Sequence, residues 1–453
     1  MKIKLLSYIS AFIVASYIVY LDYLFVQSTV GKIVQIFFPE IPRYSVHEFV
    51  TYLFLTTGAF VILFYLAYFI FYLYIKENEG SKLIPRFFPK VSIVIPAHNE
   101  AINIGRLLES IQYQDYPFEC YEIIVVDDGS VDGTGEIAMR YGAKVIRHEK
   151  NVGKAKALEE GIKAAKGDVI ITMDADSHFA DGSSLRNIVE ELFSRPFIGV
   201  STGVLRIEKR TGKLIEKLQE LEFLYSFDVG RRVQSYLDWL LVVPGAFSAF
   251  KSYFIKSLPT IPKDTLGEDF DLGMIAYRAG LTSSFEPHAR IRIYTEPMES
   301  WRGLYKQRVR WYYGGLQVLA KHRDMILNRK YGERGIFLFF HMIFLEYFLP
   351  VLHVFGIVMF PSILILQNLL GFQIFDINVP MKVLVTVFLL VLLLQYLPSI
   401  FVSTLTIVME WGSKHVLRYI PVIFLYHFLY NVILSFAKVD AIQKFLRRVP
   451  QSW

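Results

Sequence analysis

Residues 91–100 read Val-Ser-Ile-Val-Ile-Pro-Ala-His-Asn-Glu, a β-branched apolar run that leads directly into a turn and a helical pattern. The same arrangement returns three times along the chain. The further apolar runs are residues 123–126, 144–146 and 169–173, with helical patterns at 102–112, 135–141 and 155–165 between them. Strands that are apolar throughout and alternate with helices predict a parallel sheet covered on both faces. We therefore expect an α/β domain built outward from residues 91–100.

Acidic residues follow two of these predicted strands. Asp127 and Asp128 come after the second, and Asp174 and Asp176 after the fourth. Ligands of open α/β sheets bind outside the carboxyl ends of the strands, where these side chains would lie. Two carboxylates two positions apart can share a divalent cation, and that cation can neutralise a diphosphate. Each motif also has an ordinary structural interpretation, since Asp-Asp-Gly-Ser is a good turn or helix cap.

Lys154 and the acidic pair at 268–269 likewise have both a structural and a functional interpretation. Lys154 begins a helical pattern, where it is either a solvated lysine or a phosphate contact at a helix N-terminus. Glu268 and Asp269 follow Gly267 and precede an apolar helical pattern, so they are either capping acids or functional carboxylates. The histidines at 98, 148 and 178 are scattered, and we expect them to have structural or surface roles rather than to bind a metal.

Composition places the chain in a membrane. Of its 453 residues 53% are hydrophobic and only 20% are charged, where soluble proteins average about a quarter. These values exclude a disordered protein and a purely water-soluble enzyme. The single cysteine, Cys120, excludes a disulfide framework and a zinc site with several cysteines. In this context the net charge of +6 indicates cytoplasmic flanks and contact with anionic lipid, and not nucleic acid.

Five stretches are apolar and long enough to cross a bilayer, which takes about 20 residues. They are residues 5–26, 49–75, 336–370, 383–409 and 419–437. The first is too long for the hydrophobic part of a signal peptide, so we expect it to be retained. The stretch 336–370 is long enough to contain a second span, an interfacial turn or a tilted helix. Lysines and arginines crowd the exit of the second stretch, which predicts a cytoplasmic middle domain.

These patterns divide the chain into four parts. Residues 1–76 form two N-terminal transmembrane helices, 77–300 the cytoplasmic α/β domain, 301–334 amphipathic interface helices, and 335–453 about three transmembrane helices with a basic tail. The stretch 301–324 is amphipathic and basic, as expected of a helix that lies on anionic lipid. It also contains Gln307, Arg310 and Trp311, whose side chains suit phosphate pairing and stacking on a sugar.

Six motifs occur in one order along the chain: Pro96-Ala-His-Asn99-Glu100, Asp127-Asp128-Gly129, Gly153-Lys154, Asp174-Ala-Asp176, Gly267-Glu268-Asp269 and Gln307-x-x-Arg310-Trp311. This ordered set resembles the membrane-embedded branch of the inverting family 2 glycosyltransferases. That branch includes poly-N-acetylglucosamine, chitin, hyaluronan and cellulose synthases. The resemblance covers roughly residues 90–324. It implies a GT-A fold, Rossmann-like with a mostly parallel sheet, beside transmembrane helices and interfacial amphipathic helices.

The resemblance also implies roles for the matching residues. Those that would bind the nucleotide-sugar donor are Pro96, Asn99, Glu100, Asp127, Asp128, Lys154, Asp174 and Asp176, with Lys154 on the diphosphate. Asp176, and with it Asp174, would hold Mg²⁺ or Mn²⁺. Asp269 matches the general base. Those that would border the acceptor and the leaving diphosphate are Gly245, Glu268, Gln307, Arg310 and Trp311. Gly267 stands where many cellulose synthase relatives carry threonine, whereas hyaluronan-type relatives tolerate glycine there.

From this resemblance we expect an inverting transferase in the plasma membrane, with its catalytic domain in the cytoplasm. It would transfer a sugar from a UDP-sugar such as UDP-N-acetylglucosamine to a growing polysaccharide, form β-linkages and move the polymer across the membrane. The sequence does not decide whether a small membrane partner subunit is needed. Gln395 and Asn431 either line a path for the polymer or form hydrogen bonds between helices.

Two other functions are alternatives. One is a non-processive enzyme with a lipid acceptor, such as a polyprenyl phosphate or a glycolipid. The other is a transporter or channel with a degenerate regulatory domain, which the intact Asp174, Asp176 and Asp269 disfavour.

Overall fold

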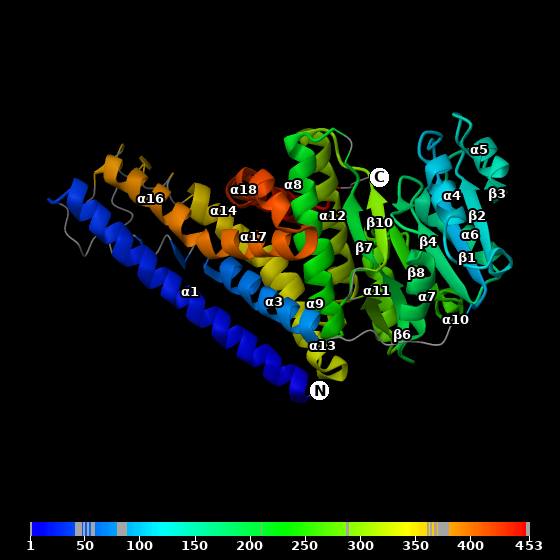
Figure 1. Ribbon diagram of the computed structural model, residues 1–453, viewed down its shortest axis with the longest axis horizontal. Helices are drawn as coiled ribbons and strands as arrows, with labels where there is room; N and C mark the ends of the chain where they lie inside the picture. Colours follow the sequence, from blue (N-terminus) through cyan, green and yellow to red (C-terminus); the bar gives the residue numbers. More distant parts are fainter. Residues whose placement is uncertain are drawn as a thin grey trace. The chain divides into compact units, whose positions relative to one another are not determined.

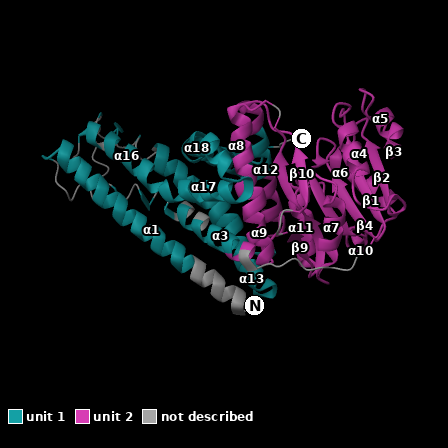
Figure 2. Cartoon of the chain, viewed as in Figure 1, with its two compact units in different colours: residues 1–73, 305–312, 324–449 teal, residues 74–304, 313–323, 450–453 magenta. Residues whose placement is uncertain are grey.

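The computed structural model describes residues 2–40, 59–78, 88–209, 211–286, 290–359 and 380–449, together with residues 48, 50–51, 54–55, 362, 365–366 and 369. The chain forms two compact units (Figure 2). The first contains residues 1–73, 305–312 and 324–449, and the second contains residues 74–304, 313–323 and 450–453. Each unit is described by itself below.

The second unit is built on a seven-stranded sheet (Figure 1). In spatial order its strands are β3 (Lys144–Arg147), β2 (Tyr121–Asp127), β1 (Val91–Ala97), β4 (Val169–Met173), β8 (Phe247–Lys251), β6 (Ile198–Thr202) and β9 (Thr282–Phe285). The pairings are parallel except for β8, which runs antiparallel to both β4 and β6. Every residue of β1 is buried, because strands flank it on both sides and helices cover it. The prediction of a mostly parallel α/β sheet is confirmed.

Helices and a second, smaller sheet complete this unit. The helices are α4 (Ile104–Gln112), η1 (Phe118–Cys120), α5 (Thr134–Arg140), α6 (Lys154–Ala164), α7 (Ser184–Phe193), α8 (Leu214–Glu222), η2 (Phe223–Val229), α9 (Gly230–Tyr236), α10 (Ser252–Ser257), α11 (Glu268–Arg278) and the second half of α12 (Trp301–Lys321). The small sheet has the order β5 (His178–Phe179), β10 (Arg292–Thr295) and β7 (Val204–Ile207). The sequence analysis predicted neither the small sheet nor strands β6, β8 and β9 of the large one.

The position of α6 is fixed by close packing on the sheet. Gly161 lies so near β1 that a Cβ atom there would come within 2.3 Å of Val94 Cγ1. Ala157 and Leu158 of the same helix join a buried apolar cluster with Val94 and Ile170. Because no bulky side chain separates helix from strand, the helix N-terminus, which begins at Lys154, is held at the carboxyl edge of the sheet.

The first unit consists of apolar helices. They are α1 (Lys2–Phe37), α3 (Ala59–Asn78), α13 (Glu333–Phe337), η5 (Leu338–Phe348), α14 (Leu349–Val354), η6 (Phe355–Met359), α16 (Met381–Gln395), α17 (Leu397–Trp411), η7 (Ser413–His415), α18 (Val416–Leu425), η8 (Tyr426–Tyr430) and α19 (Asn431–Leu446), with short turns η3 (Arg323–Met325) and η4 (Arg329–Tyr331) at the boundary in sequence.

Among the described residues, four helical stretches are long and apolar enough to cross a membrane: 12–37, 333–358, 385–411 and 413–446. They correspond to the first, third, fourth and fifth predicted spans, and the first and last extend further along the chain than predicted. The second predicted span, 49–75, lies partly outside the described residues. Its described part contributes a shorter apolar helix over residues 66–76.

Candidate active site

The loop after β1 is joined to the loop after β2 by Asn99. This residue adopts a left-handed conformation, with φ of 56°, which asparagine tolerates better than most residues. Its backbone N–H donates to Ser130 Oγ at 2.9 Å, and its Oδ1 accepts from the Val131 N–H at 3.0 Å. Glu100 follows, and its carboxylate accepts a hydrogen bond from Asn103 at 2.8 Å. Asn99 therefore positions the loops, while Glu100 lies among the other acids of the site.

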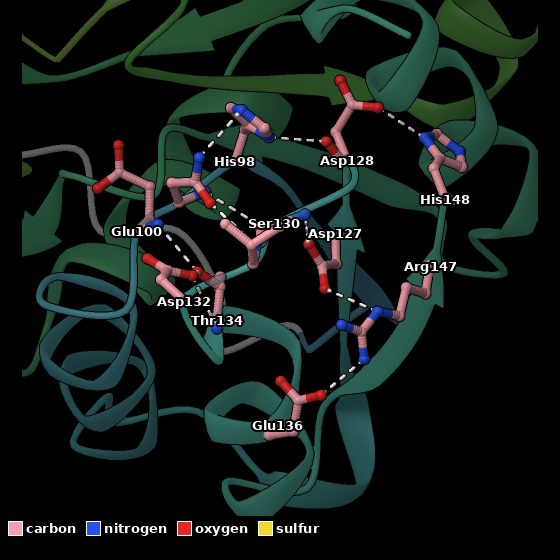
Figure 3. Close-up of polar contacts among 12 residues, drawn as sticks. His98, Glu100, Asp127, Asp128, Ser130, Asp132, Thr134, Glu136, Arg147 and His148 are labelled. Atoms are coloured by element: carbon pink, nitrogen blue, oxygen red, sulfur yellow. Dashed lines mark hydrogen bonds and ion pairs between the residues drawn. The ribbon is translucent and has the colours of Figure 1, made fainter. Parts of the chain in front are cut away.

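Asp127 and Asp128, both predicted to bind the donor, are engaged within the protein (Figure 3). Asp127 is fully buried, accepts from the Ser130 N–H at 3.0 Å, and lies 3.5 Å from Arg147 Nε. Asp128 accepts from the backbone N–H groups of Val152 and Gly153 at 2.9 Å each. The two carboxylates thus fix the loops that lead into α5 and α6.

His98 and His148 both contact Asp128, which agrees with the structural roles expected of them. His98 Nδ1 lies 2.7 Å from the Asp128 carbonyl oxygen, and His148 Nδ1 lies 2.7 Å from Asp128 Oδ1. The hydrogen bond with Asp128 raises the pKa of His148, and Glu160 on its other ring nitrogen adds to this. Burial opposes the charge of Asp128, but the bonds from His148, Val152 and Gly153 hold the pKa of that carboxyl below its usual value.

Replacing His148 with glutamine is expected to destabilise the domain most at low pH. The pKa of His148 is higher in the folded than in the unfolded protein, so its stabilising contribution is fully present below about pH 6.5 and is lost as pH rises through the folded value. Hydrogen bonds to charged groups contribute about 1.5–3 kcal/mol. The melting temperature should therefore fall by several degrees at about pH 6 and by much less at about pH 9. An equal loss at both pH values would contradict the assignment.

Lys154 lines a pocket at the carboxyl edge of the sheet. Its Nζ is 2.6 Å from Asp174 Oδ1 and 3.8 Å from Glu268 Oε1. Burial alone would lower the pKa of Lys154, but Asp174 and Glu268 outweigh burial and raise it. The residues that line this pocket also include Pro96, Gly245 and Asp269. The structure thus brings together in one cavity residues that are far apart in the sequence.

Asp269 also lines this pocket, and two backbone groups hold its carboxylate. Gly245 N–H donates to its Oδ2 at 3.0 Å, and the Phe270 N–H donates to its Oδ1 at 2.7 Å. Glu268 beside it is buried, and burial raises its pKa to about 7, with a further contribution from the charge of Asp269. Of the two neighbouring acids, Asp269 is half-buried and lies on the pocket wall with its carboxylate oriented, as a general base requires.

Replacing Gly245 with alanine is expected to lower turnover about tenfold without unfolding the protein. The added Cβ would lie 3.4 Å from Lys154 Nζ and 3.7 Å from Asp269 Oδ2, which are ordinary contacts but occupy space between the two groups. Gly105→Ala is a matched control, because its Cβ would meet only Tyr141 and Ile137 at 3.7 Å or more. If Gly245→Ala kept wild-type turnover, the substrates would not occupy the space between Lys154 and Asp269, and this prediction would be wrong.

The acidic pair after β4 fits a divalent cation. Burial, together with the charges of Asp174 and Glu100, raises the pKa of Asp176 to about 7, so a bound cation would relieve an unfavourable concentration of negative charge. No group of three or more His, Cys, Asp or Glu side chains suited to a metal occurs among the described residues. A cation on Asp174 and Asp176 would therefore complete its coordination with phosphate or water oxygens, as Mg²⁺ commonly does.

The segment with Gln307, Arg310 and Trp311 forms part of α12 in the first unit. Arg308, which the sequence did not single out, connects two members of this motif. It is buried, donates a hydrogen bond to Gln307 Oε1, and places its guanidinium 4.0 Å from the centre of the Trp311 ring. Arg308 therefore orients the indole that was predicted to stack on a sugar, whereas the contact of this motif with an acceptor stays a prediction.

The second half of α12 is bound tightly to the segment that carries Asp269. Asp271, fully buried, accepts from Lys321 Nζ at 2.8 Å and lies 2.7 Å from His322 Nε2. Gly314 packs so closely that a Cβ there would come within 2.8 Å of the Leu266 carbonyl carbon. Sequence patterns did not point to Asp271 or His322, which are 51 positions apart. Together they hold the start of α11 in place, and with it Asp269.

Comparison with known proteins identifies this domain. Residues 92–258 match the family model described as glycosyl transferase family 2. This domain belongs to glycosyltransferase family 2. The matched residues include β1, β4, Lys154, the Asp174–Asp176 pair and Gly245, and Asp269 follows shortly after them.

Two relatives are similar to this chain over a longer stretch than the family model. The chain is 30% identical over 261 residues to a poly-beta-1,6-N-acetyl-D-glucosamine synthase of Staphylococcus epidermidis, covering 56% of this chain and 62% of that protein. It is 32% identical over 288 residues to the probable glycosyltransferase YdaM of Bacillus subtilis, covering 60% and 66%. The matched part of the chain thus spans less than two thirds of the length of these relatives.

One solved structure has a similar fold. The mannosyltransferase PcManGT from Pyrobaculum calidifontis, in complex with GDP-Man and Mn²⁺, superposes with a TM-score of 0.51 at 18% identity. The similarity covers 84% of this chain and 95% of that one. The GT-A fold implied by the motifs is therefore confirmed.

Proposed function

We propose that the protein is an inverting membrane glycosyltransferase that transfers N-acetylglucosamine from UDP-N-acetylglucosamine to the growing end of a polysaccharide. The observation that carries this proposal is the single pocket lined by Lys154, Asp174 and Asp269. The positively charged ammonium group of Lys154 and the oriented carboxylate of Asp269 suit a reaction in which a diphosphate leaves while a hydroxyl is deprotonated. The synthase from Staphylococcus epidermidis supports the choice of sugar and the β-1,6 linkage.

The reaction assigns one task to each group. The acceptor hydroxyl oxygen attacks the anomeric carbon of the donor sugar, and its proton passes to Asp269. The bond between the anomeric carbon and the diphosphate oxygen breaks, and the electron pair leaves with UDP. Lys154 stabilises the negative charge that develops on the diphosphate. Attack opposite the leaving group inverts the anomeric carbon, so an α-linked donor gives a β-linkage.

The two aspartates after β4 would help the diphosphate to leave. Asp176, with Asp174, would hold Mg²⁺ or Mn²⁺, and that cation would supply further positive charge at the diphosphate. Asp174 also forms the ion pair with Lys154, so it would orient the lysine toward the same phosphate oxygens. Glu100 contributes negative charge on the other side of Asp176.

The four apolar helical stretches support a multi-pass protein in the plasma membrane, and the basic residues after the second predicted span support a cytoplasmic catalytic domain over residues 77–300. In this arrangement the transmembrane helices would guide the growing polymer outward, with or without a small membrane subunit. Export by the same chain that polymerises the sugar would avoid releasing a long polar polymer into the cytoplasm.

The experiment is incubation of the purified protein in nanodiscs with a panel of UDP- and GDP-sugars and Mn²⁺ or Mg²⁺, with and without EDTA. Nucleotide release and product length are measured, and Asp269→Asn is the control. Long chains from UDP-N-acetylglucosamine, absent with EDTA and in the variant, would support the proposal. Transfer of a single sugar to added polyprenyl phosphate or glycolipid would instead identify a lipid glycosyltransferase, and no turnover with any donor would overturn both functions.

A further inference from the structure

Gln317, in the second half of α12, is a polar residue that the mechanism above does not use. Its Oε1 accepts a hydrogen bond from the Leu266 backbone N–H at 2.9 Å. Leu266 comes immediately before residues 267–269, so this bond holds the peptide from which the turn with Asp269 begins. The two partners are 51 positions apart in the sequence, and the fold brings them together.

Two glycines let α12 approach this peptide closely. A Cβ atom on Gly314 would come within 2.8 Å of the Leu266 carbonyl carbon and 2.9 Å of the Gly267 nitrogen. A Cβ atom on Gly267 would lie 3.4 Å from the Gly314 carbonyl carbon. These neighbours are backbone atoms, which cannot rotate away as the end of a long side chain can. Gln317, about one helical turn after Gly314, therefore binds Leu266 across a contact that leaves the peptide little room to shift.

The other end of this turn is also bound to α12 and the residue after it. Asp271 is fully buried and accepts from Lys321 Nζ at 2.8 Å. Arg278 Nη2 lies 3.2 Å from His322 Nδ1, and because arginine can only donate, Nδ1 accepts and Nε2 donates to Asp271 at 2.7 Å. Burial alone would raise the pKa of Asp271, but the hydrogen bonds from His322 and Lys321 outweigh burial and hold it below its usual value.

Asp269 lies between these two attachments. The Asp271 N–H donates to the Gly267 carbonyl oxygen at 2.9 Å, which closes the first turn of α11 around Asp269. The carboxylate itself accepts from the Gly245 N–H at 3.0 Å. A general base must lie within hydrogen-bond reach of the proton that it takes, and a displacement of about 1 Å can cost about a hundredfold in rate. A shift of the peptide before Gly267 would therefore be passed on to the reacting group.

We propose that Gln317 is a positioning residue for the base, because its hydrogen bond with the Leu266 N–H sets the distance between the Asp269 carboxylate and the acceptor hydroxyl. Gln317 does not line the pocket that holds Lys154, Asp174 and Asp269. It acts through Asp269 and has no part in donor binding. The inference rests on the proposed function, because it takes Asp269 as the base.

The test is a double-mutant cycle on the full chain in nanodiscs, with Gln317→Met introduced into the wild type and into Asp269→Asn. Methionine keeps the length of the side chain and loses the amide oxygen. In the wild-type background we expect kcat for transfer from UDP-N-acetylglucosamine, or from whichever donor the wild type uses, to fall about tenfold, with UDP affinity within about twofold. In Asp269→Asn the same substitution should cause no further loss, since a residue that acts through the base has no effect without it. Gln317→Glu, which keeps an acceptor oxygen, should retain most of the wild-type kcat.

Gln112→Met is the matched control. Gln112 is an exposed residue of α4 whose side chain donates to the Tyr141 carbonyl oxygen at 3.2 Å, so it also makes a hydrogen bond with the backbone, but it does not line the pocket. Its variant should keep kcat within about twofold of the wild type. Gly314→Ala is a second test variant, because its Cβ would displace the same peptide, and Gly105→Ala is its control.

The outcomes separate the two proposals. Equal fold losses from Gln317→Met in the two backgrounds would mean that Gln317 only supports the fold, and an unchanged kcat would mean that its hydrogen bond does not position Asp269. Either result would overturn the inference and leave the proposed function intact. If Gln317→Met fails to fold, Gly314→Ala in the same two backgrounds decides the question. A wild-type protein that turns over no donor overturns the proposed function and this inference with it.

Discussion

Replacing Asp269 with asparagine is expected to lower the rate of sugar transfer by about 10²–10⁴-fold, which is the usual contribution of a general base. Asparagine has almost the same shape, and its amide oxygen still accepts a backbone hydrogen bond such as that from Gly245, so the pocket should persist. The amide cannot take up the proton of the acceptor hydroxyl. Nucleotide release and sugar incorporation should therefore fall together, while the affinity for UDP, measured by calorimetry, stays near that of the wild type.

Asp264→Asn is the matched control for this substitution. Asp264 precedes the same helix, but its side chain is 63% exposed and it pairs with Lys321 at 2.8 Å. Surface pairs of this kind contribute little, so its variant should retain nearly full activity. If Asp269→Asn kept more than about a tenth of the wild-type rate, the base would have to be another group, and Glu268 would be the next to replace.

Replacing Lys154 with methionine is expected to lower kcat by about 10²–10³-fold and to weaken UDP binding. Methionine preserves most of the aliphatic volume, so the loss can be attributed to the missing charge at the diphosphate. Asp174 also loses its partner at 2.6 Å, which leaves the acids around Asp176 with one positive charge fewer. The affinity for divalent cations, measured by Mn²⁺ titration with UDP present, should rise or stay constant while turnover falls.

Lys156 provides the control, since it lies two positions along the same helix. Its side chain is 52% exposed and its ion pair with Glu160 is long, at 3.7 Å. Lys156→Met should leave both UDP binding and turnover within about twofold of the wild type. Equal losses in the two variants would mean that substitution at the start of α6 perturbs the helix itself, and the assignment of Lys154 to the diphosphate would fail.

The first four strands of the large sheet could be predicted from the sequence because strands that pair with one another are close along the chain. β1, β2, β3 and β4 are apolar runs separated by single helices, and such alternation has one common structural solution. β8 was missed because it pairs antiparallel with β4 only after a long insertion that holds four helices or helical turns and three strands. The small sheet was missed because β5 has only two residues, too few to form a pattern.

The sequence likewise identified some residues of the candidate site and missed others. Lys154, Asp174 and Asp269 belong to short motifs that stand out in the sequence, and the structure brings them to one pocket. Arg308 and Asp271 do not stand out, because their roles depend on burial and on partners that only the fold brings to them. Periodicity identifies the buried face of a helix, but it does not show that a polar residue on that face has lost its contact with water.

The antiparallel strand β8 also has a consequence for how the protein is made. Thr172 of β4 and its partner Ser248 are 76 positions apart, so a ribosome must synthesise this whole interval before β4 acquires its second neighbour. Until then the nascent sheet presents an unpaired edge strand that is apolar except for Thr172, the kind of surface that drives chains to aggregate. Fragments that end before β8 should therefore depend on chaperones, and synthesis that slows within this interval should reduce the yield of folded protein.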